Sequence, residues 1–272
     1  MHRYLFKLGA VTVYSYGALL ALAFLLGTVW AAQRAKRYAI DRNTLVDLVL
    51  VILIFSLIGA RIFFVFLEWD YYRLHLADAL KIWEGGLVFY GGLLAGLAAA
   101  AGFIRVKKMR FSAVADVLSP PIALGIAIGR LGCFLNGCCW GKISFRWGIC
   151  FPARDNPGPF AQQVYAGLIS PHAACSLPVL PTQLYEAVAC LMICLVLLRI
   201  ERHAHAEGSL FWTLVLLYAV FRFFIEGVRY YEPCFILGSL TVSQLISIAL
   251  SAVAAAMLVC RVRPVLRRKD KN

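Results

Sequence analysis

The sequence is poor in charged residues, and acidic residues are the scarcer of the two signs. Asp, Glu, Lys and Arg make up 15% of its 272 residues, whereas a soluble domain carries about 25%. This deficit excludes a soluble globular domain, because too few polar residues remain to cover its surface. Intrinsic disorder is excluded too, since 62% of the residues are hydrophobic and so apolar a chain does not stay solvated. The composition is typical of a protein embedded in lipid.

The sequence also lacks internal repeats, low-complexity segments and a small-residue cleavage site after its first long apolar run. We therefore expect one membrane domain over residues 1–272 and no cleavable signal. Nine cysteines in a chain of this length are not a small disulfide scaffold. The formal net charge of +13 would suit nucleic acid, but an apolar chain with basic loops fits orientation in a membrane better.

Seven stretches are long and apolar enough for a helix that crosses a bilayer, which needs about 20 residues. Strands of an outer-membrane barrel would be about 10 residues long and would alternate, so we predict helices and an all-α fold. The predicted spans are Tyr14–Ala32, Leu45–Leu67, Gly85–Ile104, Ala113–Phe134, Thr182–Leu198, Ser209–Gly227 and Leu240–Cys260.

The distribution of Lys and Arg predicts the orientation of these spans. The segments after spans one, three, five and seven hold roughly twice as many Lys and Arg as the opposite side, and basic loops stay in the cytoplasm. We therefore expect the N-terminus outside and a basic cytoplasmic tail at 261–272. The segment 141–181 then lies outside, where it would cover a site at the outer interface. We expect the aromatic-rich segment Glu68–Glu84, also outside, to lie partly along the membrane surface.

Three arginines lie inside the predicted spans: Arg61, Arg130 and Arg222. A charged side chain at the bilayer centre costs about 2.5–3.5 kcal/mol even on the lenient insertion scale, so such a residue faces a partner or an aqueous cavity. For Arg61, a side chain that reaches up to the headgroups is an equal alternative. Arg130 and Arg222 are the stronger candidates for a functional site.

The surroundings of these two arginines differ. Arg130 lies in a glycine-rich block, Gly129–Gly141, and we expect span four to end there in an irregular loop that lines a cavity. Arg222 belongs to a stripe of span six in which Tyr218, Arg222, Glu226 and Arg229 recur at helical spacing on one face. We expect this face to point inward, although Arg222 and Glu226 would also make a purely structural pair.

Two buried arginines indicate an anion site. The guanidinium fork matches phosphate oxygens and stays protonated, and the phosphate nearest to a membrane protein is the phospholipid headgroup. The residues themselves therefore predict a site that handles phospholipid near the outer leaflet.

Other polar or small residues in the spans are less specific. Gly92 and Gly96 form a small-residue pattern that lets helices approach closely, and Tyr90 beside them suits a cavity wall or the membrane interface equally. The remaining polar residues near the spans are Asp116, Gln183, Tyr185 and Glu186. Glu186, near the start of a span, is also explained by the helix dipole alone.

In these blocks the sequence resembles the prolipoprotein diacylglyceryl transferase family. The resemblance runs in order along the chain and rests on Tyr16-Gly17, Gly59-Ala60-Arg61, Gly85–Gly92, Gly129–Gly141, Pro181–Glu186 and Phe221–Arg229. It implies seven helices in the inner membrane of a bacterium, with the active site toward the periplasm. It also implies transfer of a diacylglyceryl group from phosphatidylglycerol to the lipobox cysteine of a preprolipoprotein. No metal or cofactor is implied.

The resemblance gives roles to the residues singled out above. Arg130 and Arg222 would bind the phosphate and stabilise charge on the leaving group. Glu226 would orient Arg222 or act as a base. The candidates for substrate binding are Tyr16, Arg61, Tyr90, Asn136, Cys138, Tyr218 and Arg229.

Three positions depart from the family pattern, with Cys133 in place of Asn, Cys138 in place of Glu and Tyr90 in place of His. We therefore expect a divergent member or a paralogue, and a different donor lipid or acceptor stays open as an alternative. Six cysteines are expected in or near the outer segments, where disulfides are permitted: Cys133, Cys138, Cys139, Cys150, Cys175 and Cys234. A nucleophilic Cys138 and a metal site completed by His172 are alternatives.

Two other functions compete with the leading interpretation. The first is a related phospholipid-dependent transferase with a different acceptor. The second is a lipid transporter, which is disfavoured because the sequence shows no pair of related halves.

Overall fold

The structure is a computed structural model, and it describes residues 4–8, 11–81, 85–154, 156–203, 206–230, 236–237 and 240–269. Seven of its helices are long and apolar enough to cross a membrane, which confirms the predicted all-α membrane fold. These helices are α1 (Ser15–Arg34), α2 (Arg42–Leu67), α4 (Phe89–Val106), α5 (Phe111–Asn136), α7 (Thr182–Glu201), α8 (Ser209–Glu226) and α9 (Val242–Lys269).

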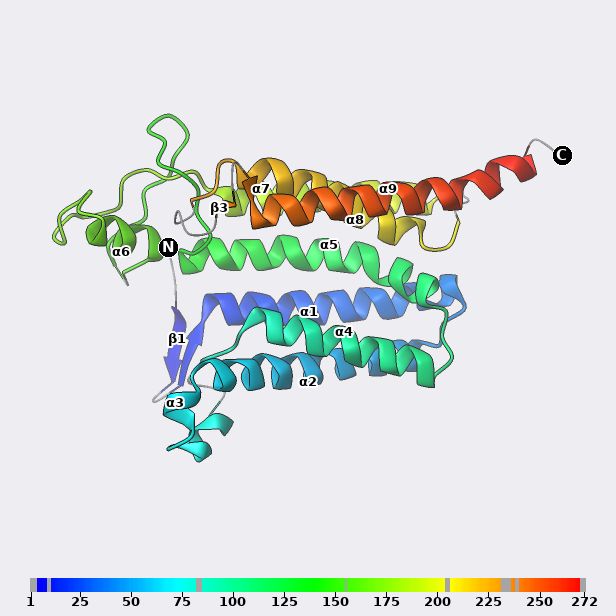
Figure 1. The fold of residues 1–272 in the computed structure, drawn as a ribbon, viewed down its shortest axis with the longest axis horizontal. Helices are drawn as coiled ribbons and strands as arrows, with labels where there is room; N and C mark the ends of the chain where they lie inside the picture. Colours follow the sequence, from blue (N-terminus) through cyan, green and yellow to red (C-terminus); the bar gives the residue numbers. More distant parts are fainter. Residues whose placement is uncertain are drawn as a thin grey trace. The chain divides into compact units, whose positions relative to one another are not determined.

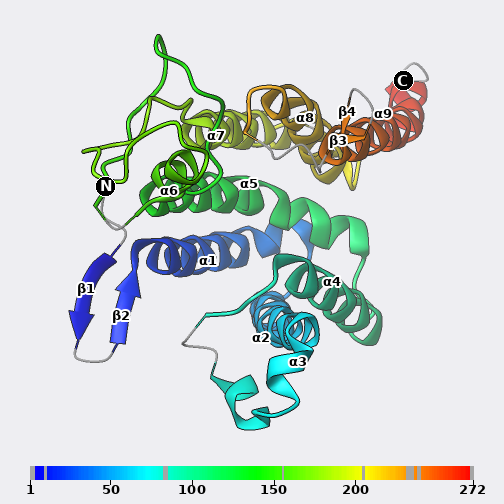
Figure 2. The same cartoon turned by 60° about the vertical axis from the view of Figure 1, so that its left-hand side comes forward.

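Shorter elements connect these helices. Two antiparallel strands, β1 (Tyr4–Leu8) and β2 (Val11–Tyr14), form a hairpin that leads directly into α1 (Figure 2). The others are the 3-10 helices η1 (Ala35–Tyr38) and η2 (Leu76–Leu80), the helices α3 (Trp69–Tyr72) and α6 (Gly158–Tyr165), and the strand pair β3 (Ile236–Leu237) and β4 (Leu240–Thr241).

The contacts divide the chain into two compact units. One unit comprises Trp30–Val114 and the other comprises Met1–Val29 together with Ala115–Asn272. In the larger unit α8 packs against α7 and α9, and α1 runs beside α5 (Figures 1 and 2).

In the smaller unit glycines bring α2 and α4 into close contact. A Cβ added to Gly59 would lie 2.6 Å from the Gly91 carbonyl oxygen, and one added to Gly91 would lie 2.5 Å from that of Gly59. A Cβ added to Gly96 would likewise lie 2.3 Å from the Oγ of Ser56. In lipid, where apolar burial does not drive helices together, small residues allow the close packing that does. The small-residue pattern expected in span three is thus confirmed.

The ends of the helices have local causes. The Asp41 side chain accepts the backbone N–H of Thr44 at 2.8 Å and caps α2. α8 is capped from another helix, because the buried Asp116 of α5 accepts the N–H of Gly208 at 2.6 Å and that of Phe211 at 2.9 Å. Span three begins at Phe89 and not at the predicted Gly85, since Gly85 has a left-handed φ of 94°.

The predicted end of span four is confirmed. We expected the helix to end in an irregular loop within Gly129–Gly141, and α5 continues through Gly129 and Gly132 and ends at Asn136, inside this block. A Cβ on Gly132 would lie 3.1 Å from the ring of Tyr16, so this glycine provides room for α1. The chain turns at Gly137, whose φ is 71°.

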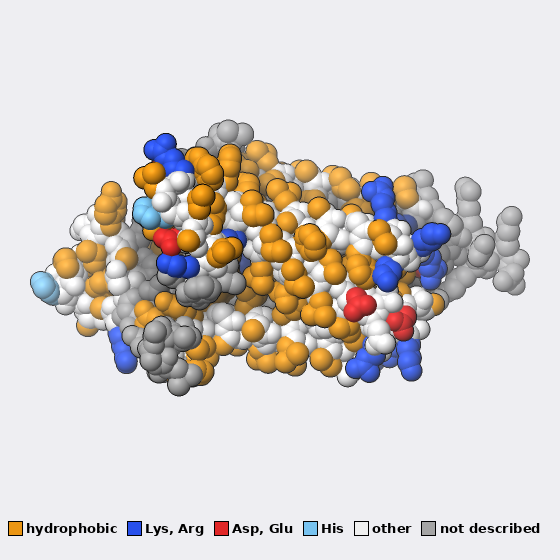
Figure 3. All heavy atoms as spheres, turned by 90° about the horizontal axis from the view of Figure 1, so that it is seen from below, with side chains coloured by type: hydrophobic (Ala, Val, Ile, Leu, Met, Phe, Trp, Pro, Cys, Tyr) orange, Lys and Arg blue, Asp and Glu red, His pale blue; other side chains and the backbone are white. Residues whose placement is uncertain are grey.

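Large hydrophobic side chains remain exposed along the spans, including Leu25, Ile62, Phe66, Leu94 and Leu195. Figure 3 shows hydrophobic side chains over the middle of the face that it draws, with Lys and Arg gathered toward its ends. Exposed apolar patches of this extent mark contact with a partner or with lipid. Together with the seven long helices they define an integral membrane protein.

Candidate active site

A cluster of two arginines and two glutamates lies inside the larger unit. Arg130 comes from α5, Glu186 from α7, and Arg222 and Glu226 from α8. Arg130 Nη2 is 2.7 Å from Glu186 Oε1, and Arg222 Nη1 is 3.8 Å from Glu186 Oε2. Arg222 Nη2 is 2.9 Å from Glu226 Oε2. Both carboxylates are buried and both guanidinium groups are mostly buried.

Glu186 joins the two arginines, and our sequence analysis left it out of the candidate site. It accepts a hydrogen bond from the Tyr218 hydroxyl at 2.8 Å in addition to its two ion pairs. Tyr218 also lies in hydrogen-bonding contact with Arg130. The helix dipole alone does not account for these contacts of Glu186. The sequence feature that could have identified Glu186 is a carboxylate within an otherwise apolar span. A buried charge needs a partner of opposite charge, so this carboxylate indicated that a cation lies nearby.

The polar stripe of span six is confirmed for three of its four members. Tyr218, Arg222 and Glu226 share the inward face of α8, as the spacing predicted. Arg229 lies beyond the end of α8 and pairs by an isolated β-bridge with Gly141. Arg222 and Glu226 form the ion pair that we weighed as purely structural, but Arg222 reaches Glu186 as well.

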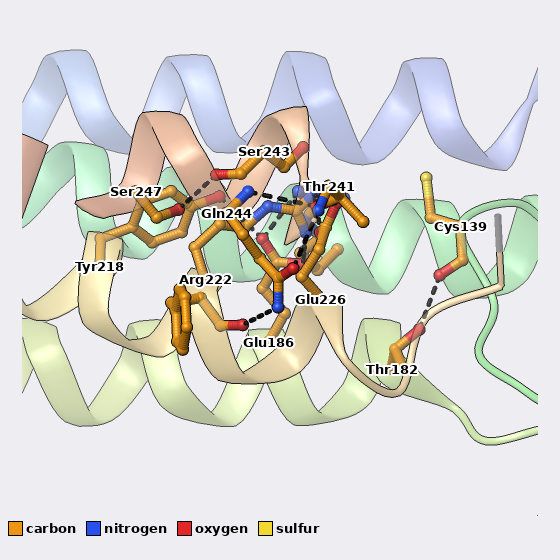
Figure 4. A network of polar contacts seen from close by, with 12 residues as sticks. Cys139, Thr182, Glu186, Tyr218, Arg222, Glu226, Thr241, Ser243, Gln244 and Ser247 are labelled. Atoms are coloured by element: carbon orange, nitrogen blue, oxygen red, sulfur yellow. Dashed lines mark hydrogen bonds and ion pairs between the residues drawn. The ribbon is translucent and has the colours of Figure 1, made fainter. Parts of the chain in front are cut away.

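The cluster extends toward α9. The Thr241 hydroxyl donates to Glu226 Oε1 at 3.3 Å, and Gln244 Nε2 donates to the Phe223 carbonyl oxygen at 3.3 Å. Figure 4 shows these side chains converging from neighbouring elements. The charged cluster is therefore held by groups from four helices and the short strand β4.

The first turn of α7 connects this cluster to the cysteine-containing turn after α5. Gln183 Nε2 donates to the Cys138 carbonyl oxygen at 2.6 Å, and the Thr182 hydroxyl donates to that of Cys139 at 2.8 Å. One turn further along α7, Glu186 holds Arg130. The resemblance block Pro181–Glu186 thus fixes both the arginine and the turn that follows it.

The turn after α5 brings three cysteines together. The sulfur atoms of Cys133, Cys138 and Cys139 all lie within 4.8 Å of one another. The Cys138 thiol donates to the Cys133 carbonyl oxygen at 3.6 Å, and Asn136 ends α5 one residue before the turn. Hydrogen bonds from the other two thiols lower the pKa of the Cys139 thiol, and the positive charges of Arg229 and Arg130 lower it further.

Arg61 belongs to the smaller unit and binds carbonyl oxygens of the chain itself. Its Nε donates to Ala79 at 2.8 Å, and Nη1 and Nη2 donate to Gly85 and Asp78, each at 2.7 Å. The guanidinium also lies over the ring of Tyr72, 5.5 Å from its centroid. In the structure Arg61 therefore fastens the segment that follows α2.

The remaining candidates lie at less enclosed positions. Tyr90 is 68% exposed at the start of α4, and Tyr16 lies against Gly132 near the start of α1. Cys150 and Cys175 are neighbours in the segment 141–181, where desolvation first and then Cys175 raise the pKa of the Cys150 thiol. His172 does not belong to the group of three cysteines, and Cys234 lies outside the described residues.

Two guanidinium groups from different helices share one carboxylate in this cluster. The fold and the cluster together define a seven-helix membrane protein with a buried cluster of paired arginines and glutamates.

Comparison with known proteins gives the family. Residues 3–260 match the prolipoprotein diacylglyceryl transferase family. A phosphatidylglycerol–prolipoprotein diacylglyceryl transferase of Geobacillus kaustophilus (strain HTA426) is 33% identical over 267 residues, 96% of this chain and 93% of the relative. That of Limosilactobacillus reuteri (strain DSM 20016) is 33% identical over 258 residues, 94% and 90% of the two chains. The chain belongs to the prolipoprotein diacylglyceryl transferase family, as its sequence blocks predicted.

Proposed function

We propose that this protein transfers a diacylglyceryl group from phosphatidylglycerol to the cysteine thiol of a prolipoprotein. Two of its relatives carry this activity in their names. The observation in the structure that carries the proposal is the bridge of Arg130 and Arg222 by the single carboxylate of Glu186.

The bridge matters because a phosphate group resembles a carboxylate in the spacing of its oxygens and in its charge. Arginines that share one carboxylate are close enough to share a phosphate by their other N–H groups. Glu186 and Glu226 balance the two positive charges until the headgroup binds. In a site with little water, the same guanidinium groups stabilise the charge that grows on the leaving phosphate.

The reaction forms a C–S bond and breaks a C–O bond. The thiolate of the acceptor cysteine attacks the glyceryl carbon that carries the phosphate, and glycerol phosphate leaves with the bonding electrons. The thiol must lose its proton to attack. Glu226 is bound by Arg222 and by Thr241, which favours a role in orienting Arg222 over a role as base.

We further propose that the chain lies in the bacterial cytoplasmic membrane with its N-terminus and the segment 141–181 outside. The positive-inside distribution of Lys and Arg supports this orientation. We also propose that Tyr16, Tyr90, Asn136, Cys138, Tyr218 and Arg229 contact the substrates. Arg61 would act indirectly, by holding the segment after α2.

The test uses the purified protein in detergent with phosphatidylglycerol and a peptide that carries a lipobox cysteine. We expect the peptide to gain the mass of a diacylglyceryl group while an equal amount of glycerol phosphate is released. Arg130→Ala and Arg222→Ala should each lower kcat/KM about 100-fold. Arg199→Ala is the matched control, because Arg199 is exposed near the end of α7, away from the cluster; it should keep wild-type activity.

Each other outcome bears on the proposal. Glycerol phosphate release without a gain in peptide mass would indicate a different acceptor on the same lipid site. Absence of both, with a known relative active alongside, would contradict the proposed reaction.

A further inference from the structure

No bond is made or broken at the sulfur atoms of Cys133, Cys138 and Cys139 in the reaction proposed above, in which Cys138 only contacts the substrates. The cluster of these three cysteines arises from the way in which α5 ends. The Cys138 N–H donates to the Cys133 carbonyl oxygen at 3.1 Å and the Gly137 N–H donates to that of Phe134 at 3.2 Å. This pair of bonds, with left-handed Gly137 between them, is a Schellman motif. The motif brings the side chains of its first and last residues into contact, and here both are cysteines.

The third thiol is added by the next residue. Cys139 has a φ of 61°, a left-handed conformation that a residue with a side chain rarely adopts. With this turn its sulfur comes within 4.8 Å of the other two. A disulfide uses only two thiols. Three thiols that converge on one point can all bind the same metal ion, so this arrangement favours a metal site.

The backbone of this turn is fixed by its surroundings. Gln183 and Thr182 of α7 bind the carbonyl oxygens of Cys138 and Cys139, and the Cys138 thiol donates to the Cys133 carbonyl oxygen at 3.6 Å. Such outer contacts orient metal ligands and raise affinity. Arg130 and Arg229 interact electrostatically with Cys139, so positive charge is available to offset an anionic thiolate complex.

Thiolate sulfur selects soft ions with filled d shells. In a tetrahedral zinc site with a Zn–S distance of about 2.3 Å, neighbouring sulfurs lie about 3.8 Å apart. The three sulfurs would move together by less than about 1 Å to reach that spacing. The ligands lose their S–H protons to water on binding, and water completes the coordination of zinc, whereas copper(I) needs no fourth ligand.

We propose that Cys133, Cys138 and Cys139 bind one d10 metal ion, Zn(II) or Cu(I), through three thiolates. The ion links Cys133, in the last turn of α5, to Cys138 and Cys139 in the turn that follows. It thereby makes this turn, which contacts α7 beside the arginine cluster, more rigid. Its binding is measured without any transfer reaction, so this proposal stands or fails independently of the proposed function.

The experiment uses the full-length protein in detergent, reduced and stripped with a chelator under nitrogen. One arm adds Zn(II) in competition with a chromophoric zinc chelator. The other adds Cu(I) in competition with bicinchoninate. We expect about one ion per chain in at least one arm, X-ray absorption showing three sulfur ligands at about 2.3 Å for zinc, and a higher thermal midpoint on binding.

Variants test which thiols bind. Cys133→Ser, Cys138→Ser and Cys139→Ser should each weaken binding about tenfold or more and remove the rise in midpoint. Cys190→Ser, buried on α7, and the double variant Cys150→Ser/Cys175→Ser should bind like the wild type. The stripped variants are first compared with stripped wild type by thermal unfolding, so that a misfolded variant is recognised.

Three results would overturn the proposal. The first is less than about a fifth of an ion per chain in both arms, well below the one ion that a single site takes up. The second is equal binding by the variants of the cluster and by their controls. The third is a disulfide within the cluster of the unreduced protein, found by peptide mass mapping, together with no ion bound after reduction.

Discussion

At the scale of single residues, the charge of Glu186 holds two arginines from different helices. Glu186→Gln keeps the shape of the side chain but removes the charge. The NH₂ group of its amide is a hydrogen-bond donor and would face guanidinium groups that are also donors. We predict at least about a tenfold fall in kcat, because small displacements of positioning groups have effects of this size or larger. Turnover of phosphatidylglycerol and peptide measures it.

The control for this change is Cys190→Ser, which alters another buried residue one turn along α7. Glu186→Asp should recover part of the lost kcat, since it restores the charge. Wild-type turnover by Glu186→Gln would show that the bridge between the arginines is dispensable.

Asp116 illustrates a charged residue with a purely structural role. It is fully buried and accepts two backbone N–H groups at the start of α8. Asp116→Ala leaves those donors without this acceptor and should lower the stability by about 1.5–3 kcal/mol. Thermal unfolding in detergent measures the change. Asp47→Ala, at an exposed position of α2, should have little effect, and equal losses in the two variants would contradict the capping role.

At the scale of secondary-structure elements, the contact between α2 and α4 depends on glycine. A side chain at Gly91 would meet the Gly59 carbonyl oxygen and the Cβ of Phe63. Gly91→Ala should therefore lower the thermal stability by about 1–3 kcal/mol, the usual cost of overpacking. Gly102→Ala lies in the same helix with open space around it and should be neutral or slightly stabilising. A similar loss in both variants would mean that helix propensity, not contact, sets the effect.

The elements themselves were largely predictable from the sequence, because the hydropathy of a membrane span is a local property. All seven spans were found, and three of the four stripe residues of α8 share a face as the spacing required. The β1–β2 hairpin was missed, since its strands are short and alternate only weakly. The end of α5 was placed within two residues, although the first two glycines of the block lie inside the helix, where Gly132 serves packing against Tyr16.

The candidate site was predictable only in part. The cost of burying charge singled out Arg130 and Arg222, but the partner of a buried arginine lies on another helix and leaves no local signal. Glu186 was therefore left out, and Arg61 gave no sign that it would bind carbonyl oxygens. The family blocks located the helices of the site without specifying which side chains meet.

At the scale of the whole molecule, the fold places α7 with Thr182 at one end and Arg202 just beyond the other. The positive-inside rule assigns the Arg202 end to the cytoplasm and the segment that precedes Thr182 to the outside. Cys150 lies in that segment and is exposed. Its neighbour Cys175 would form a disulfide with it in an oxidising compartment, so the test of orientation uses Cys175→Ser.

We predict that a membrane-impermeant maleimide added to intact spheroplasts labels Cys150 in the Cys175→Ser protein. A cysteine introduced as Arg202→Cys should be labelled only after the membrane is permeabilised, because the impermeant maleimide does not cross the lipid bilayer. Peptide mass spectrometry assigns the label to its cysteine, so the other cysteines need not be removed. If Arg202→Cys is labelled before permeabilisation and Cys150 is not, the orientation is the opposite of the one predicted. The arginine cluster, which lies toward the Thr182 end of α7, would then face the cytoplasmic leaflet.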